Sequence, residues 1–154
     1  MERKYYHIPT LPAGTTVATV DWNVVPAAQI DTYRWLDGGY EPHAEARLAF
    51  LPGYGFALRM SCIERSPRAI YSGYNEPVYT DSCLEFFAAW AEGSPTRDRR
   101  YMNMEMNARG TLLSCLGTDR HARVPVRDIT GGSIPDVRGE ILPDRWSVTA
   151  GIPA

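Results

Sequence analysis

Residues 101–116, YMNMEMNARGTLLSCL, decide the expected fold. Methionines at positions 102, 104 and 106 alternate with polar residues, so every second side chain is apolar. Strict alternation of this kind is typical of a β-strand with one buried and one solvated face. The short turn Ala108-Arg109-Gly110 then leads into a second, mostly apolar run at residues 111–116. The stretch therefore predicts an antiparallel hairpin with one apolar and one polar face.

A second stretch of the same kind lies earlier in the chain. Residues 47–50 are followed by the turn LPGYG and then by apolar residues at positions 56, 58, 60 and 62, which predicts another hairpin. Further strands are expected at residues 15–25, 30–36 and 146–152, whereas residues 117–140 suggest irregular structure. Strands joined by turns with little helix predict one all-β domain over residues 1–154. The expected architecture is an antiparallel β-sandwich of the jelly-roll or immunoglobulin-like kind.

Composition and charge narrow the classes of function. The chain has 154 residues and a formal net charge of −2, which argues against nucleic acid as a partner. No run approaches the ~18 apolar residues of a membrane helix, so a membrane is not an expected partner. No apolar stretch follows the charged N-terminus, so we expect no signal peptide and either a cytoplasmic protein or a trimmed secreted domain. The three cysteines and three histidines lack metal-ligand spacing, and we expect no metal site.

The segment at residues 81–90, DSCLEFFAAW, allows two interpretations. Ser82 and Glu85 have the spacing of a capping box ahead of a short helix. As a strand, the same segment would place Leu84, Phe86 and Ala88 on one face. The local pattern does not decide between helix and strand.

Three pieces of the chain, in order, carry a family resemblance. They are residues 77–87 (PVYTDSCLEFF), 101–110 (YMNMEMNARG) and 146–153 (WSVTAGIP). Together they resemble the family 9 carbohydrate-binding modules, especially the family 9-like branch that shares a DOMON-like β-sandwich. The acidic segment with Asp81 and Glu85 is the most specific piece, and the resemblance extends over residues 15–153. It implies that residues 81–90 form a strand whose carboxylates face a rim of the sandwich.

The resemblance also implies a function, namely non-catalytic recognition of a glycan or of a sugar end. The family holds a terminal sugar between two aromatic side chains. One precedes the acidic strand, where this chain has Tyr79, and the other would follow the last residue of this chain. Calcium and a linked glycoside hydrolase are further expectations of the resemblance, although the sequence has no contiguous acidic loop of the kind that binds calcium strongly.

A sugar site needs an aromatic face for C–H groups and fixed polar groups for hydroxyls. The side chains that meet this description, and that we select as candidate ligand contacts, are Trp35, Arg59, Glu64, Tyr71, Asn75, Tyr79, Asp81 and Glu85. Structural alternatives stay open: a core position for Trp35, a solvated loop for residues 71–77, and an ion pair of Arg59 with Glu64 or Glu85. On one strand face, Asp81 and Glu85 would lie about 13 Å apart. Glycosidase carboxylates are only ~5–9.5 Å apart, so we expect no catalytic residues and no enzyme.

Two other functions remain as alternatives. The chain could be a structural or interaction β-sandwich that has lost its sugar pocket, which the missing second aromatic and the missing signal peptide favour. A catalytic domain associated with glycoside hydrolysis fits the sequence least well.

Overall fold

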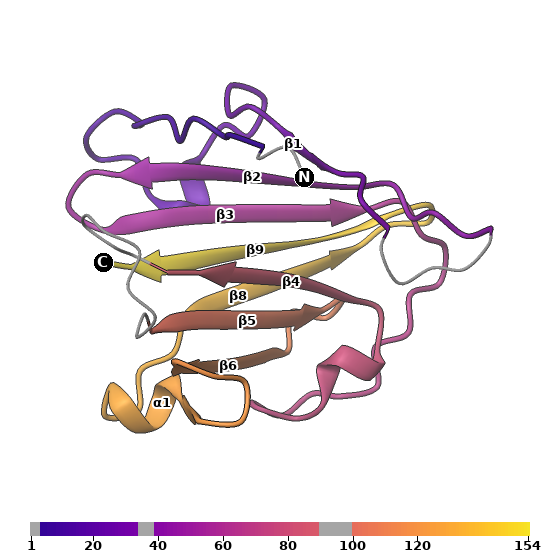
Figure 1. The fold of residues 1–154 in the computed structure, drawn as a ribbon. Coiled ribbons are helices and arrows are strands. Elements are labelled where there is room, and N and C mark those ends of the chain that lie inside the picture. Colours follow the sequence, from indigo (N-terminus) through magenta and orange to yellow (C-terminus); the bar gives the residue numbers. More distant parts are fainter. Residues whose placement is uncertain (1–3, 34–38, 90–99) are drawn as a thin grey trace.

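The computed structural model describes residues 4–33, 39–89 and 100–154, and within them the chain forms two antiparallel β-sheets. Sheet A has the strand order β1-β2-β3-β9-β8, and sheet B has the order β4-β5-β6-β7. The strands of sheet A are β1 (Ala28–Ile30), β2 (Ala44–Leu51), β3 (Gly55–Cys62), β8 (Asp136–Ile141) and β9 (Trp146–Pro153). Those of sheet B are β4 (Cys83–Ala88), β5 (Tyr101–Asn107), β6 (Leu112–Gly117) and β7 (Arg123–Pro125). Figure 1 shows β4 and β5 passing in front of β9 and β8.

Helical structure in the described residues is limited to three short elements. They are the 3-10 helices η1 (Val17–Thr19) and η2 (Val78–Thr80) and the single-turn helix α1 (Val126–Ile129). The expected all-β antiparallel sandwich is therefore confirmed. Nowhere in the described part of the chain is a helix long and apolar enough to cross a membrane.

The core lies between the two sheets. Leu58 and Met60 of β3 and Val148 of β9 meet Met104 and Met106 of β5, and all five are buried. These are the inward positions that the alternating patterns predict, and both expected hairpins, β2–β3 and β5–β6, are present in antiparallel register. The ambiguous segment is a strand, β4, which pairs with β5.

The predicted strand at residues 15–25 is wrong. This segment contains η1 and loops, and it packs across the outer face of sheet A, where Val20 and Val25 lie with Ala49, Leu51 and Ala57 in a second buried cluster. A high content of β-branched residues shows that a segment fits a half-buried surface, but it does not show that the segment pairs with a neighbouring strand. Here the valines cover a sheet face without joining its hydrogen-bond ladder.

Two other predicted boundaries need correction. The strand expected at residues 30–36 is wrong over residues 31–33, because β1 (Ala28–Ile30) ends at Ile30 and no strand follows there; residues 34–36 lie outside the described residues. Residues 117–140, expected to be irregular, contain β7, α1 and the first part of β8. Strand β8 is the last strand of sheet A, and most of its side chains are exposed. Its sequence therefore lacks the apolar alternation that reveals a half-buried strand.

Candidate functional site

Asp81 is a fully buried carboxylate that holds a loop onto sheet B. Its Oδ2 accepts hydrogen bonds from the backbone N–H groups of Ile70 (3.0 Å) and Tyr71 (3.1 Å) and from Nδ2 of Asn107 (2.9 Å). Arg68 Nε lies 3.4 Å from the other carboxylate oxygen. Burial disfavours the charged form, but these hydrogen bonds and the nearby guanidinium outweigh it and lower the pKa of Asp81. The side chain therefore faces the protein, where it fastens the loop at residues 68–71.

Asn107, which donates a hydrogen bond to Asp81, also organises the turn between β5 and β6. Its Oδ1 accepts the backbone N–H groups of Arg109 (3.1 Å) and Thr111 (3.0 Å), while its Nδ2 also donates to the carbonyl of Tyr71 (2.9 Å). Gly110 supplies the positive φ (83°) that this turn requires. The motif at residues 107–110 thus has a structural explanation.

Two more candidate residues use their polar atoms within the protein. Glu64 accepts hydrogen bonds from Ser82 Oγ and from Trp146 Nε1, both at 2.7 Å. Asn75 has a left-handed backbone (φ 61°), and its Oδ1 accepts the backbone N–H of Ser114 at 2.9 Å. Glu64 and Asn75 therefore connect loops to the sandwich through their side chains, and Tyr71 does so through its backbone carbonyl, which accepts hydrogen bonds from Asn107 and Thr111.

Glu85 differs from these residues because it points away from the core. Leu84 on β4 is buried in the core, so Glu85 projects from the outer face of sheet B, where Glu105 of β5 lies directly opposite it. Glu105 is only 6% exposed, and its Oε1 accepts a hydrogen bond from Asn103 Nδ2 at 2.8 Å. Partial burial, and next the charge of Glu105, raise the pKa of Glu85, whereas Arg123 acts in the opposite direction.

Aromatic and cationic side chains flank this carboxylate pair. Phe87 follows Glu85 on the same face and is 50% exposed. Its ring lies 6.1 Å from that of Tyr101, centroid to centroid, and the Arg123 guanidinium lies 6.0 Å from the centre of the Tyr101 ring. We call the group on this face the sheet B patch; it consists of Glu85, Phe87, Tyr101, Asn103, Glu105 and Arg123.

Most of the sheet B patch was missed by the sequence reasoning. The alternation of polar residues at 103, 105 and 107 was visible, but the partner of Glu85 depends on strand register, which sequence pattern does not provide. Tyr79, the expected aromatic before the acidic strand, lies on η2 and is 59% exposed. Trp35 lies outside the described residues.

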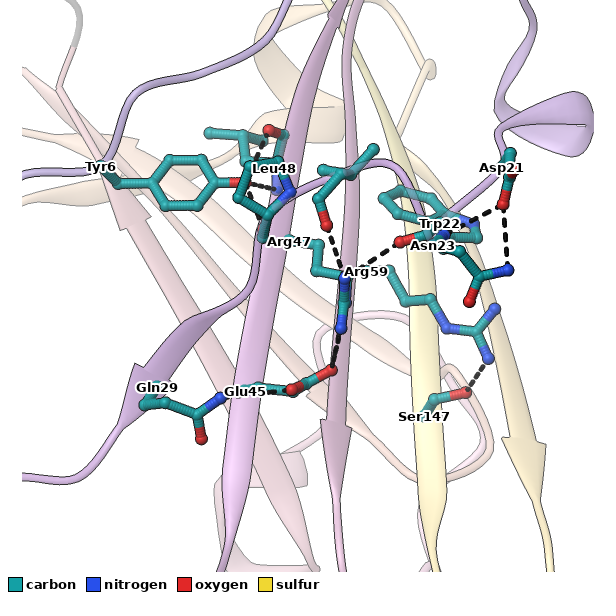
Figure 2. A network of polar contacts seen from close by, with 12 residues as sticks. Tyr6, Asp21, Trp22, Asn23, Gln29, Glu45, Arg47, Leu48, Arg59 and Ser147 are labelled. Carbon is teal, nitrogen blue, oxygen red and sulfur yellow. Dashed lines mark hydrogen bonds and ion pairs between the residues drawn. The ribbon is translucent and has the colours of Figure 1, made fainter.

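Arg59 is on the opposite side of the sandwich from Glu85. It projects from the outer face of sheet A, where Nη2 lies 3.3 Å from Ser147 Oγ (Figure 2). The same nitrogen lies 3.3 Å from Glu140 Oε2. The alternative of an ion pair with Glu64 or Glu85 is wrong in its partner, because Arg59 pairs with Glu140. Because Arg59 and Glu85 occupy opposite outer faces, they cannot contact the same sugar residue.

Calcium remains an expectation of the resemblance. Among the described residues, no three His, Cys, Asp or Glu side chains come together as a set that could hold a metal ion. Asp81 is surrounded by N–H donors, which suit its own carboxylate rather than a cation. No residue described here is assigned to calcium.

Residues 15–133 match the sequence model of carbohydrate-binding family 9. The chain belongs to this family. Its fold is similar to the crystal structure of a proposed carbohydrate-binding protein from Bacteroides uniformis, with 26% sequence identity and a TM-score of 0.71. That similarity covers 95% of this chain and 71% of the other. No curated protein matches the chain. The family and the two-sheet fold together identify this chain as a carbohydrate-binding module.

Proposed function

We propose that this family 9 module is non-catalytic and holds a sugar residue on the sheet B patch. The observation that carries the proposal is the carboxylate pair Glu85–Glu105 beside the half-exposed ring of Phe87. A carboxylate accepts hydrogen bonds through two oxygens, so an opposed pair suits neighbouring hydroxyl groups of one sugar. An exposed aromatic ring offers an apolar surface for the C–H face of that sugar.

The remaining members of the patch add donors and a second ring. Asn103 is hydrogen-bonded to Glu105, which fixes the orientation of the buried carboxylate before a ligand arrives. Arg123 lies over Tyr101 and offers guanidinium donors to sugar oxygens. Tyr79 lies on η2, which packs against β5, and the family resemblance makes it the aromatic that precedes the acidic strand. These features support recognition of a single sugar residue or sugar end.

The placement of the carboxylates supports binding rather than hydrolysis. Directly opposite residues of an antiparallel pair have Cβ atoms about 5 Å apart, so spacing alone does not separate this pair from a glycosidase pair. However, glycosidase carboxylates flank the scissile bond. Glu85 and Glu105 project from the same face of one sheet and approach a ligand from the same side. We expect no release of chromophore from aryl glycosides at any pH between 4 and 8.

The binding proposal is tested by isothermal titration with a panel of monosaccharides and short oligosaccharides. Glu85→Gln and Phe87→Ala should each weaken binding about ten-fold or more, since each removes a direct contact. The matched controls are Glu41→Gln, an exposed carboxylate, and Tyr5→Ala, an exposed ring, and neither should change the affinity. Unchanged affinity in both patch variants would reject the sheet B patch as the sugar site.

The linked glycoside hydrolase and the calcium ion are tested separately. A module of this kind would direct a hydrolase to its glycan, and the adjoining coding sequence in the source genome shows whether such a domain is fused or adjacent. We expect sugar binding without a metal cofactor, supported by the lack of a clustered donor set in the described residues. Titration in EDTA should then give the same affinity as titration in calcium.

A further inference from the structure

The outer face of sheet A carries a groove that the sheet B patch does not use. One wall is the N-terminal segment at residues 15–23, β3 and β9 form the floor, and β8 forms the other wall. The groove consists of two cavities of about 490 and 660 Å³, each within the ~300–1,000 Å³ typical of ligand sites. The residues that line both cavities are Val20, Trp22, Arg59, Glu140 and Ser147. The two cavities are therefore halves of one groove.

The groove is long compared with the sheet B patch. Its lining reaches from Arg145, directly before β9, to Asp136, which pairs with Gly151. The distance along β9 from position 145 to 151 is about 20 Å at ~3.3 Å per residue. The sheet B patch runs from position 101 to 105 along β5, which is about 13 Å on the same scale. The groove is therefore the longer of the two, and it has the length for several sugars of a chain.

The charges along the groove are balanced. The first cavity is lined by three carboxylates and three guanidinium groups, from Asp21, Glu45, Glu140, Arg47, Arg59 and Arg145. The second is lined by two of each, from Asp136, Glu140, Arg59 and Arg138. Carboxylates accept hydrogen bonds and guanidinium groups donate them, so their alternation suits ligand groups that do both. Hydroxyl groups have this property, and the balance favours a neutral polyhydroxyl ligand over an anionic one.

The centre of the groove is fixed in place by the protein itself. Arg47 donates to Glu45 (3.1 Å) and to the carbonyl of Trp22 (3.0 Å), which ties the N-terminal wall to β2 (Figure 2). Arg59 is held by Glu140 and Ser147 at the junction of the two cavities. Trp22 lines both halves and supplies an aromatic side chain beside these polar groups. Groups held before binding lose less entropy when the ligand arrives.

We propose that this groove binds an internal stretch of a neutral oligosaccharide chain, as a second carbohydrate site on the face opposite the sheet B patch. The proposal rests on the carbohydrate-binding class of the family and not on the location of the first site. Trp22 packs against the sugar rings, and the Arg59–Glu140–Ser147 group hydrogen-bonds their hydroxyls. Because the groove contacts the middle of a chain, it does not require a free reducing end.

The test uses cello- and manno-oligosaccharides of two to six units whose reducing ends have been converted to alditols. Affinity measured by isothermal titration should increase with chain length for the unmodified protein. Arg59→Met and Glu140→Gln should each lower the affinity for the longest chains about ten-fold, because each removes a charge-assisted hydrogen bond. Arg109→Met and Glu41→Gln, at exposed positions outside the groove, are the matched controls and should bind as the unmodified protein does. Thermal melting confirms folding, which loss of the solvent-accessible Arg59–Glu140 pair should barely affect.

The two sites are distinguished in the Glu85→Gln background. If the affinity of Glu85→Gln still increases with chain length and that of Arg59→Met does not, the groove proposal is supported, whether or not the sheet B patch binds sugar. If the increase of affinity with chain length is lost in Glu85→Gln but kept in Arg59→Met and Glu140→Gln, the groove proposal is overturned and the proposal of a sugar site on the sheet B patch stands. Absence of binding to all end-reduced chains, or binding of oligogalacturonides in preference to neutral chains, also overturns it.

Discussion

Replacing Glu85 by Gln should stabilise the protein while weakening sugar binding. Glu85 and Glu105 are opposed across β4 and β5, and like charges in this position are destabilising. Burial first, and then the charge of Glu105, raise the pKa of Glu85 above its ordinary 4.5. The raised pKa means that the native state favours the protonated form. Stability from this group is therefore fully present below pH 4.5 and is lost as the pH rises through the raised pKa.

The expected size follows from the pair geometry. Opposed like charges cost about 0.2–1 kcal/mol, and the lower part of that range applies because Glu85 is exposed. For a domain of this length, 1 kcal/mol corresponds to a change of about 2–4 °C in Tm. Glu85→Gln should therefore raise Tm at pH 7 by up to about 2 °C, since the lower half of that range is about 0.2–0.5 kcal/mol. At pH 4, where the native carboxyl is already largely protonated, the gain should nearly vanish.

Differential scanning calorimetry of the wild type and of Glu85→Gln at pH 4 and pH 7 measures both values. Glu41→Gln, which changes an exposed carboxylate elsewhere, corrects for the general effect of removing one negative charge. A lower Tm for Glu85→Gln at pH 7, or an equal gain at both pH values, would refute the repulsion between the two carboxylates.

Three further predictions concern other parts of the sandwich. Asp81→Ala should lower the free energy of unfolding in urea by about 3 kcal/mol, because one buried and two part-buried N–H donors lose their acceptor. Since the pKa of Asp81 is lowered from 3.8, its ionised form stabilises the fold above pH 3.8, and wild-type unfolding should show this contribution lost as the pH falls through the lower native pKa. Gly139→Ala should cost about 1–3 kcal/mol in the same assay, since its methyl group would collide with the backbone carbonyl of Ala108. Burial, with the charges of Glu85 and Glu105, raises the pKa of Cys83 to about 12, so mass spectrometry should find this thiol unmodified after iodoacetamide treatment of native protein at pH 8 and modified after unfolding.

The parts of the fold that could be predicted from sequence share one physical property. In β3, β5 and β9, one side of the strand contributes to the core, and alternation along the strand records this. The N-terminal segment and β8 lack such a relation between pairing and burial. The first covers a sheet face without pairing in it, and the second pairs at an edge while most of its side chains remain exposed. The sequence pattern therefore predicted a strand for the N-terminal segment, which has none, and irregular structure for the segment that contains β8.

The candidate site was predictable to a smaller extent. Asp81 and Glu85 were expected on one face of a strand, but Asp81 precedes β4 and is turned under the loop at residues 68–71. Of these two carboxylates, only Glu85 faces outward. Its partner Glu105 lies on β5, twenty residues further along the chain. Arg59 was selected as a polar contact for sugar hydroxyls, and its alternation with the apolar residues of β3 is consistent with its place on an outer face. Sequence could not indicate which of the two outer faces this was, because that depends on how the sheets stack.

The outward-facing polar residues of β5 differ in how far the fold itself explains them. Asn103, Glu105 and Asn107 are all buried on a face where polar side chains are ordinarily solvated. Asn107 has a full structural explanation in its turn and in Asp81. Asn103 also has one, because its Oδ1 accepts the backbone N–H of Cys115. Among the described residues, the hydrogen-bond donor given to Glu105 is the amide of Asn103, and Glu85 lies directly opposite it. A buried carboxylate with a like charge opposite is costly to stability, and hydroxyl donors from a sugar bound at the sheet B patch would offset part of that cost.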